Sequence, residues 1–175
     1  GLYLDHQNQL YFSSISQHKV HKILGEDGKT VIVAGGNGEG NAPNQLSYPK
    51  DVFVDQSGAV YVTDTGNDRV QKWASGSKEG ITVAGGNGYG LAANQTAYIH
   101  KIQVDPKGNV YLLESGHDGE SFKVRINMWP PGAREGIARL SYRLNYRDNI
   151  SRAIDDIGDF FVNEKGDIIY TEANS

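Results

Sequence analysis

The feature that most constrains this chain is an internal repeat. Residues 31–40 read VIVAGGNGEG and residues 81–90 read ITVAGGNGYG, so two nearly identical segments lie about fifty positions apart in a chain of 175 residues. The same offset carries Leu4-Asp5 onto Val54-Asp55 and Val104-Asp105. A fixed period of this length indicates one structural module that is stacked several times.

The second unit shows the strand pattern of this module most clearly. Residues 51–54, 59–63, 69–73 and 81–84 are rich in β-branched and aromatic side chains, and turns containing Gly, Asn or Asp separate them. Four short antiparallel strands at a period of about forty to fifty residues are typical of a propeller blade. We therefore predict an all-β fold, a β-propeller built from four-stranded antiparallel blades. A β-sandwich is the rival, but it gives no reason to repeat VAGGNG at one spacing.

The repeat organises residues 1–175 as a single partial β-propeller of about three and a half blades. The blade units are expected at approximately 1–36, 48–86, 98–140 and 150–175, and the last is incomplete because it stops where its third strand should begin. Three explanations stay open: the sequence is an excerpt of a longer polypeptide, another chain completes the half-blade because an unpaired sheet edge invites strand addition, or the chain closes on itself as a distorted ring. Head-to-tail completion that does not close would build a filament. The chain starts without methionine, which predicts processing or an excerpt.

The second unit resembles the NHL repeat family. The family joins a proline-led inner strand to V-D-x-x-G-x-I-Y-V-x-D and N-x-R-V-x-x-F, and the matching residues are Pro49, Asp55, Gly58, Tyr61, Asp64, Asn67, Arg69 and Val70, with Trp73 in the Phe place. The first unit departs further, with Ser14 and Lys19 at the positions of Asp64 and Arg69. The third unit has Glu114 for the aspartate and about six extra residues within 116–123. The resemblance implies a propeller, usually six-bladed.

Charge and composition set limits on function. The formal net charge is −4, and the densest basic stretch, between Arg134 and Arg147, is interrupted by acidic and apolar residues. Nucleic-acid binders usually carry clustered Lys and Arg on one face, so nucleic acid is not a favoured partner. No apolar run reaches the 18 or more residues of a membrane span, so no membrane association is expected. The chain has no cysteine, so disulfides give no information about its compartment.

Two residue sets raise the question of metal binding. Carboxylates recur at the end of the second strand as Asp64, Glu114 and Glu172, and such oxygens suit calcium. An Asp before Thr-Gly-Asn is also typical of a turn that accepts its own backbone N–H groups, and this reading is favoured. The lyase-like relatives of this fold would place histidines around a channel, but only His100 precedes an inner strand. We expect no metal, no cofactor and no catalytic residues.

Two further features concern recognition. The extra residues of the third unit contain His117, Asp118 and Glu120, and they form a candidate binding loop because loops on rigid scaffolds commonly carry function. Two N-x-S/T sequons, at Asn94 and Asn149, are candidate glycosylation sites and imply secretion if they are used.

The sequence favours a non-catalytic extracellular scaffold or recognition module that binds a protein or a glycan. Self-assembly through the open half-blade, with copies of the chain as partners, is a further expectation. Two alternatives stay open. One is a metal-dependent lyase-like or lactonase-like enzyme whose ligands lie partly in other blades, and the other is a cytoplasmic NHL domain that binds RNA or protein. No Gly-x-Ser-x-Gly elbow or P-loop supports catalysis.

Overall fold

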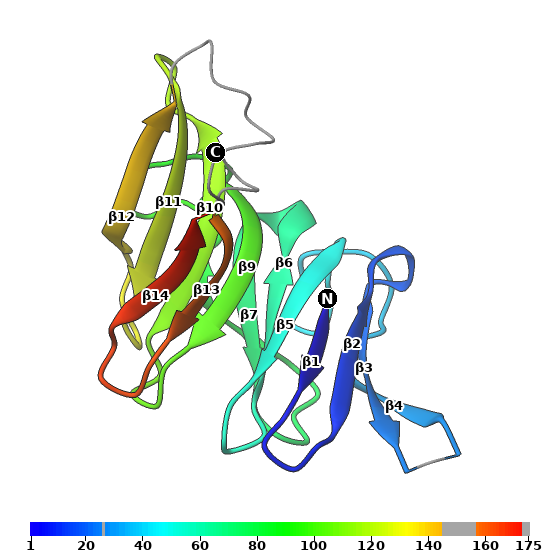
Figure 1. Ribbon diagram of the computed structural model, residues 1–175. Helices are drawn as coiled ribbons and strands as arrows, with labels where there is room; N and C mark the ends of the chain where they lie inside the picture. The colour runs from blue at the N-terminus through cyan, green and yellow to red at the C-terminus, as the bar shows by residue number, and fades with distance from the viewer. Residues whose placement is uncertain (26, 145–156, 173–175) are drawn as a thin grey trace.

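The computed structural model describes residues 1–25, 27–144 and 157–172. The described chain is almost entirely β-structure, arranged as three four-stranded antiparallel sheets and one two-stranded sheet (Figure 1). The sheets follow the sequence in order, and each has its strands in sequence order from the inside outward. We refer to them as blades 1, 2 and 3 and the half-blade.

The strands of blade 1 are β1 (Leu2–Leu4), β2 (Leu10–Ser14), β3 (Lys19–Leu24) and β4 (Lys29–Gly35). Those of blade 2 are β5 (Pro49–Val54), β6 (Val60–Asp64), β7 (Arg69–Trp73) and β8 (Ile81–Gly85). Those of blade 3 are β9 (Tyr98–Val104), β10 (Val110–His117), β11 (Phe122–Trp129) and β12 (Ile137–Leu144). The half-blade contains β13 (Ile157–Val162) and β14 (Ile168–Glu172), and two short 3₁₀ helices occur at η1 (Ile15–Gln17) and η2 (Thr65–Asn67).

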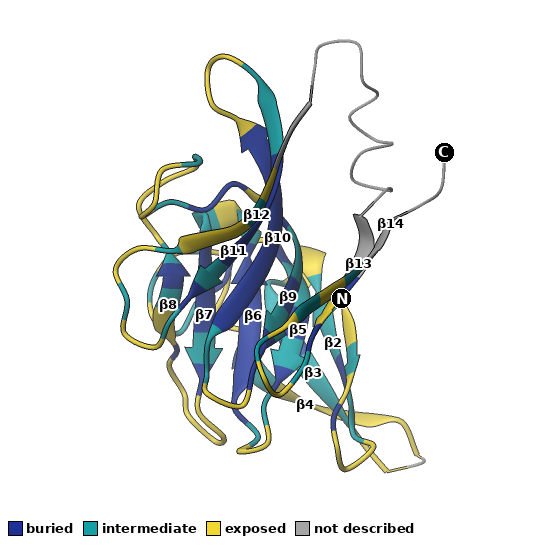
Figure 2. Cartoon of the chain, turned by 60° about the vertical axis from the view of Figure 1, so that its left-hand side comes forward, coloured by how far each residue is buried: buried dark blue, intermediate teal, exposed yellow. Residues whose placement is uncertain are grey.

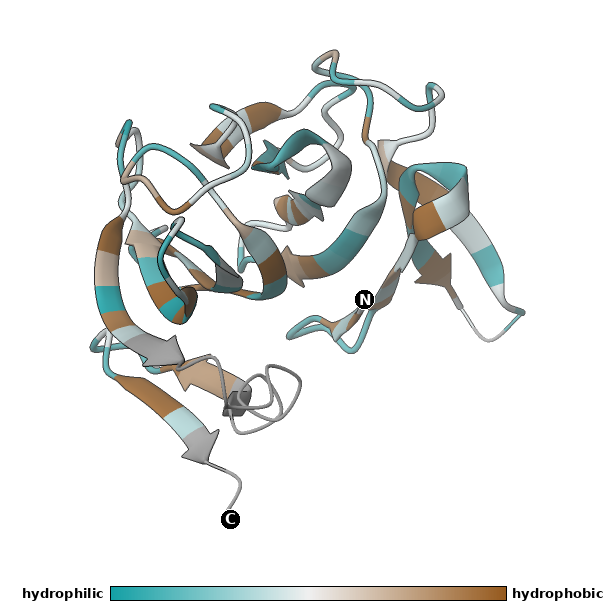
Figure 3. Cartoon of the chain, turned by 90° about the horizontal axis from the view of Figure 1, so that it is seen from above, coloured by the Kyte–Doolittle hydropathy of each residue, from teal (hydrophilic) through white to brown (hydrophobic). Residues whose placement is uncertain are grey.

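The blades stand around a common axis, as the view from above shows (Figure 3). The first strand of each blade lies innermost, and β5 contacts both β1 and β9, while β9 contacts β13. This arrangement confirms the predicted propeller fold. The four sheets span residues 2–35, 49–85, 98–144 and 157–172, and the organisation of residues 1–175 as a single domain stays a prediction.

The core consists of three apolar seams, one between each pair of neighbouring sheets. Blade 1 meets blade 2 through a cluster that includes Tyr11, Val20, Val54 and Trp73. Blade 2 meets blade 3 through Tyr61, Val70, Ala84, Ile102, Val110, Leu112 and Trp129. Blade 3 meets the half-blade through Leu113, Val124, Ile126, Phe160 and Val162. Apolar side chains on both faces of a strand follow from this arrangement, and all five residues of β6 are buried (Figure 2).

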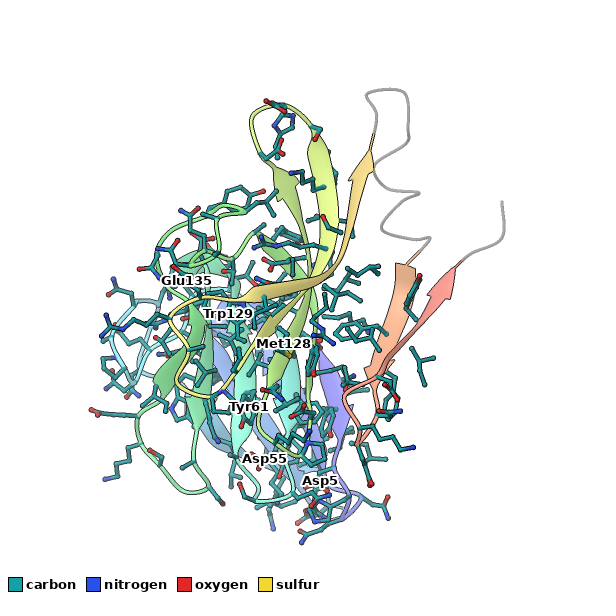
Figure 4. All side chains as sticks on the ribbon, turned by 90° about the vertical axis from the view of Figure 1, so that its left-hand side faces the viewer. Asp5, Asp55, Tyr61, Met128, Trp129 and Glu135 are labelled. Atoms are coloured by element: carbon teal, nitrogen blue, oxygen red, sulfur yellow. The ribbon has the colours of Figure 1, made fainter. Side chains whose placement is uncertain are left out.

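The two ends of the propeller differ in their turns. At one end, where Figure 4 places Asp5 and Asp55, an aspartate closes each hairpin between the first two strands of blades 1 to 3. The Oδ1 atom of Asp55 accepts the backbone N–H groups of Ser57 and Ala59, and the Tyr61 hydroxyl donates to its Oδ2 at 3.2 Å. Asp5 with Tyr11, and Asp105 with Tyr111, repeat the arrangement.

The opposite end carries the interblade loops, and we call it the loop face. It comprises the interblade loops at residues 36–48 and 86–97, the two 3₁₀ helices and the tip of the β10–β11 hairpin. The extra residues of the third unit do not make a long irregular loop, as the sequence suggested. They lengthen β10 and β11 to eight residues each, so the hairpin projects beyond its neighbours (Figure 2). No helix in the described ranges is long and apolar enough to span a membrane.

Candidate functional site: the loop face

The first interblade loop is held by a buried ion pair of blade 2, which we call the loop clamp. The Arg69 Nε donates to Asp64 Oδ2 at 2.6 Å, and the Asp64 side chain is fully buried. The Arg69 guanidinium also donates to the backbone carbonyl of Asn41 at 2.9 Å, with longer contacts to two further loop carbonyls. The other oxygen of Asp64 accepts the backbone N–H of Ser47 at 2.6 Å. Both residues of the pair therefore bind the loop that enters blade 2.

Blade 3 repeats the loop clamp with a longer carboxylate. The Arg125 Nε donates to Glu114 Oε1 at 3.1 Å, and its terminal nitrogens donate to the carbonyls of Leu91 and Gln95. Glu114 Oε2 accepts the backbone N–H of Ala97 at 2.7 Å. The clamp therefore forms in each of the two blades that an interblade loop of the VAGGNG type enters.

The loop clamps explain the carboxylates that the sequence offered as calcium ligands. Burial raises the pKa of both Asp64 and Glu114, while the guanidinium and backbone partners oppose the rise. The side chain of Glu172 lies outside the described residues. The prediction that Asp64 accepts the backbone N–H groups of its own turn is wrong, because no backbone N–H of η2 donates to its side chain. The Asp64 side chain instead accepts the backbone N–H of Ser47 in the interblade loop. Asp64 Oδ2 also accepts the side-chain amide of Asn67 in that turn, at 2.8 Å.

The interblade loops present tyrosine, asparagine and glycine at the surface. Tyr48 and Tyr98 occupy equivalent positions at the ends of the two loops, and their exposures are 52% and 45%. Tyr89 is 54% exposed on the second loop. An asparagine side chain bridges each loop internally. The Asn37 amide donates to the Asn44 carbonyl in the first loop, and the Asn87 amide donates to the Asn94 carbonyl in the second. Exposed aromatic rings therefore stand on loops whose backbones are fixed.

A second group of side chains lies where the inner strands β5 and β9 meet the loop face. The Lys50 ammonium is 3.0 Å from the Tyr98 hydroxyl and 4.3 Å from the centre of the Tyr98 ring. The Tyr98 ring is in edge contact with His100, whose Nε2 lies 2.7 Å from the Ser115 hydroxyl. Burial, with a smaller contribution from the charge of Lys50, lowers the pKa of His100 to about 4. The imidazole is therefore neutral near neutral pH.

This group arises from irregular pairing in the inner strands. In β9 the register against β10 shifts around Leu113 and Glu114, which leaves His100 as the extra residue. A similar shift in β5 falls between Pro49 and Val52. Bulges of this kind re-aim side chains and often occur beside functional sites. Sequence reasoning placed His100 but missed Tyr48, Tyr98 and Lys50, although the repeated tyrosine at the end of both interblade loops was visible.

The candidate binding loop forms the tip of the projecting β10–β11 hairpin. His117, Asp118 and Glu120 are all at the surface, but the loop is internally organised. The His117 Nδ1 accepts the backbone N–H of Gly119, and Asp118 Oδ1 accepts those of Glu120 and Ser121. The ion pair with Lys123, 2.5 Å away, lowers the pKa of Asp118. The three residues therefore hold the shape of the tip.

The remaining candidates are dispersed. Asn94 is exposed in the second interblade loop, and its use as a glycosylation site stays a prediction; Asn149 lies outside the described residues. Arg134 and Arg139 are exposed on blade 3, but Arg147 and the side chain of Arg143 also lie outside the described part. In the part of the chain that the structure describes, no three His, Asp or Glu side chains gather where they would hold a metal ion.

Comparison with known proteins places the fold. The family model for the NHL repeat matches residues 46–73, which contain Ser47, Asp64 and Arg69 of the loop clamp. The second blade is an NHL repeat. The first blade lacks the clamp residues of this NHL repeat, in agreement with its weaker resemblance. No curated protein sequence is a significant match to the chain.

Several solved propeller structures resemble this chain over 98% of its length. A streptogramin B lyase is 14% identical with a TM-score of 0.54, and 47% of that chain is covered. A selenomethionine-substituted virginiamycin B lyase from Staphylococcus aureus is 15% identical with a TM-score of 0.50 and 48% covered. A putative gluconolactonase is 12% identical with a TM-score of 0.53 and 62% covered. At these identities the likeness shows the fold alone, and the chain spans about half the length of the lyases.

Proposed function

We propose that this chain is a non-catalytic recognition module that binds a protein partner through its loop face. The observation that carries the proposal is the presence of three exposed tyrosines on or directly after loops held by loop clamps, namely Tyr48, Tyr89 and Tyr98. Tyrosine offers a large contact area at low entropic cost, and neighbouring Gly, Asn and Ser supply adaptable hydrogen bonds. The interblade loops have this composition.

The rigid support of these tyrosines favours binding. Ordering a loop on association costs free energy, and a loop that is fixed beforehand avoids much of this cost. Ser47, next to Tyr48, is bound to Asp64, and the Ala97 N–H, next to Tyr98, is bound to Glu114. Tyr48 and Tyr98 therefore each follow a residue that a loop clamp fixes.

The same contacts support the non-catalytic part of the proposal. The repeated carboxylates of the blades bind an arginine and backbone N–H groups, so these contacts account for them as structural residues. His100 and Ser115 lie within hydrogen-bond distance, but a Ser–His pair needs an acid to orient the imidazole. None of the described contacts of His100 involves a carboxylate. The chemistry named for the lyase and the lactonase belongs to those proteins.

The proposal also places the module outside the cell. The surface position of Asn94 supports this location, because an N-glycan is added only in the secretory pathway and only at accessible loops. Association of copies by completion of the half-blade stays a prediction. In the described part of the chain this sheet has two strands, β13 and β14.

The test is affinity capture followed by direct measurement. The immobilised chain would be exposed to an extracellular extract, and the retained protein would be purified and titrated by calorimetry against three forms of the chain. We expect the double variant Tyr48→Ser/Tyr98→Ser to bind at least about tenfold more weakly, as for aromatic hot spots. Leu24→Ser, which changes a 39% exposed residue at the end of β3 remote from the loop face, should bind normally.

Two outcomes would refute the recognition proposal as stated. One is a retained protein that binds all three forms equally, because binding would then not use the loop face. The other is loss of binding when the retained protein is stripped of its glycans, which would assign the ligand to carbohydrate.

A further inference from the structure

Tyr48 has an unusual backbone conformation. Its φ is +48°, in the left-handed region that residues other than glycine rarely adopt. Pro49 follows it, and the residue before a proline favours extended backbone. Sparsely populated conformations persist where the surrounding structure holds them, and they cluster at binding and switch regions. The neighbours of Tyr48 therefore have to supply a specific restraint.

His18, directly after η1, supplies this restraint. The Tyr48 backbone N–H donates to His18 Nδ1 at 3.2 Å. The two rings also meet edge to face, with their centres 5.1 Å apart and their planes at 86°. The His18 side chain is 15% exposed, whereas Tyr48 is 52% exposed. A mostly buried imidazole therefore holds both the backbone and the ring of a tyrosine that faces solvent.

The contacts of the imidazole require its neutral form. A ring nitrogen that accepts a hydrogen bond carries no proton, so Nδ1 is unprotonated and the proton of the neutral ring lies on Nε2. Nε2 faces the Glu39 carboxylate, whose Oε2 is 3.7 Å away. Glu39 Oε1 in turn accepts the Ser47 hydroxyl at 3.0 Å. We call His18, with Glu39 behind it, the histidine latch.

Acid removes the acceptor that Tyr48 uses. An imidazolium has N–H groups at both ring nitrogens, so protonated His18 cannot accept the Tyr48 N–H. The charged and titratable groups around the imidazole are the Glu39 carboxylate and the Tyr48 phenol, with Lys19 next in the chain. The charge of Glu39 favours the imidazolium and acts at Nε2, the nitrogen that Tyr48 does not use. Protonation therefore keeps the contact with Glu39 and breaks the one with Tyr48.

The second interblade loop lacks the histidine latch. At the positions of His18, Glu39 and Ser47 it has Asp68, Tyr89 and Ala97. Tyr98 begins strand β9, where it pairs with Ser115, and its φ is not positive. Tyr48 and Tyr98 therefore hold equivalent positions in the sequence but differ in backbone conformation. The second loop serves as a matched control within the chain.

We propose that neutral His18 holds Tyr48 in its left-handed conformation and releases it on protonation, so that recognition through the first interblade loop is sensitive to acid. Released Tyr48 moves towards the extended backbone that Pro49 favours and that Tyr98 already has. The effect on binding rests on the proposed recognition function, but the histidine latch is a property of the chain alone. The contact that Tyr48 makes with a partner is then strongest at neutral pH and weaker in mild acid.

Nuclear magnetic resonance of the isotopically labelled chain tests the histidine latch without a partner. The signals would be followed from about pH 8 to about pH 5, the range in which histidine ordinarily changes charge. At neutral pH the ring nitrogens of His18 should report a proton on Nε2 alone. The Tyr48 amide signal should change along the same titration curve as the His18 ring, and the Tyr98 amide should not follow it. A proton on Nδ1 at neutral pH, or a Tyr48 amide that does not follow His18, would overturn the proposal.

Two variants separate the histidine latch from a purely structural role. Asparagine tolerates the φ of +52° at position 18 and does not titrate, so His18→Asn should keep the circular dichroism of wild type and abolish the pH response of the Tyr48 amide. Glu39→Gln keeps an oxygen for the Ser47 hydroxyl but removes the charge that favours the imidazolium, so the Tyr48 response should move to lower pH. An unchanged response in either variant would contradict the proposal.

Calorimetry with the protein retained by the loop face tests the consequence for binding. Loss of one hydrogen bond corresponds to about fivefold in affinity, so wild type should bind about fivefold more tightly than His18→Asn at about pH 7.5 and equally at about pH 5.5. Comparison of the two forms at each pH removes any titration of the retained protein itself. A constant ratio at both pH values would overturn the control of binding by acid. If the loop face retains no protein, the proposed function fails, while the Tyr48 amide still decides the histidine latch.

Discussion

Replacing Arg69 with methionine should destabilise the protein strongly at neutral pH. Arg69→Met removes the charge that faces the fully buried Asp64 and the donors to the carbonyls of the first interblade loop. Removing one partner of a buried pair typically costs about 3–5 kcal/mol, because the other charge stays buried without compensation. For a chain of this length, such a loss corresponds to a decrease in melting temperature of roughly 6–20 °C.

The loss in Arg69→Met should depend on pH in a defined direction. The pKa of Asp64 is already raised by burial, and removal of the guanidinium raises it further. A carboxyl group whose folded pKa exceeds its unfolded pKa destabilises the fold at high pH, where it must be ionised, and this penalty decreases as pH falls through the folded pKa. The deficit of the variant relative to wild type should therefore be largest near neutral pH and smaller in mild acid.

Urea unfolding followed by circular dichroism measures this free energy, with two matched controls. Lys78→Met changes an exposed cation and should alter the free energy of unfolding by less than about 0.5 kcal/mol. The double variant Asp64→Leu/Arg69→Met leaves no unpaired charge and should recover part of the loss. If Arg69→Met unfolds within about 1 kcal/mol of wild type, or if the double variant is no better than the single one, the loop clamp does not stabilise the loop as argued.

Two further predictions concern backbone and charge. Gly85 has φ +68°, and a Cβ there would lie 2.5 Å from the Asp68 carbonyl oxygen, so Gly85→Ala should lower the free energy of unfolding by about 1–3 kcal/mol. Gly76→Ala is the control, because Gly76 has a similar φ of +76° but open space around it, and it should cost less. Equal losses of the two variants in urea unfolding would contradict the steric argument. The folded pKa of His100 is about 4, below the unfolded value, so its contribution to stability is present above the unfolded pKa and decreases as pH falls towards 4. Between about pH 7 and about pH 5, wild type should therefore lose more unfolding free energy than His100→Gln, and equal losses would contradict the assigned pKa.

The fold was predictable because its determinants are local and repeated. The alternation of apolar side chains around Phe53 and Tyr61, together with the glycine turn at Gly58, predicts which strands pair. The period of the sequence repeat predicts that the sheets stack as successive blades. The extra residues of the third unit were predicted as a loop, but alternation in the segment from Lys123 to Trp129 let both strands extend into them. The seams followed from the same pattern, since both faces of the middle strands are apolar.

The candidate site was less predictable because it depends on pairs that are distant in sequence. Asp64 was recognised as structural, but its partner Ser47 lies on an interblade loop whose path no local pattern specifies. The contact between Lys50 and Tyr98 joins two blades and arises from strand irregularities that sequence periodicity does not reveal. Residues of this kind become visible only when the blades are placed side by side.

Under the proposed recognition function, the loop clamp connects the stability of the propeller to binding at its loop face. Asp64 binds the residue before Tyr48, so a variant that breaks the clamp releases the loop and raises the entropic cost of binding. Tyr48→Ser, by contrast, removes contact area but leaves the clamp intact. The two changes should thus weaken binding for different reasons, and only the first should also lower the free energy of unfolding. The repeated salt bridge fixes the residue that precedes each of the two equivalent tyrosines, Tyr48 and Tyr98, in successive blades.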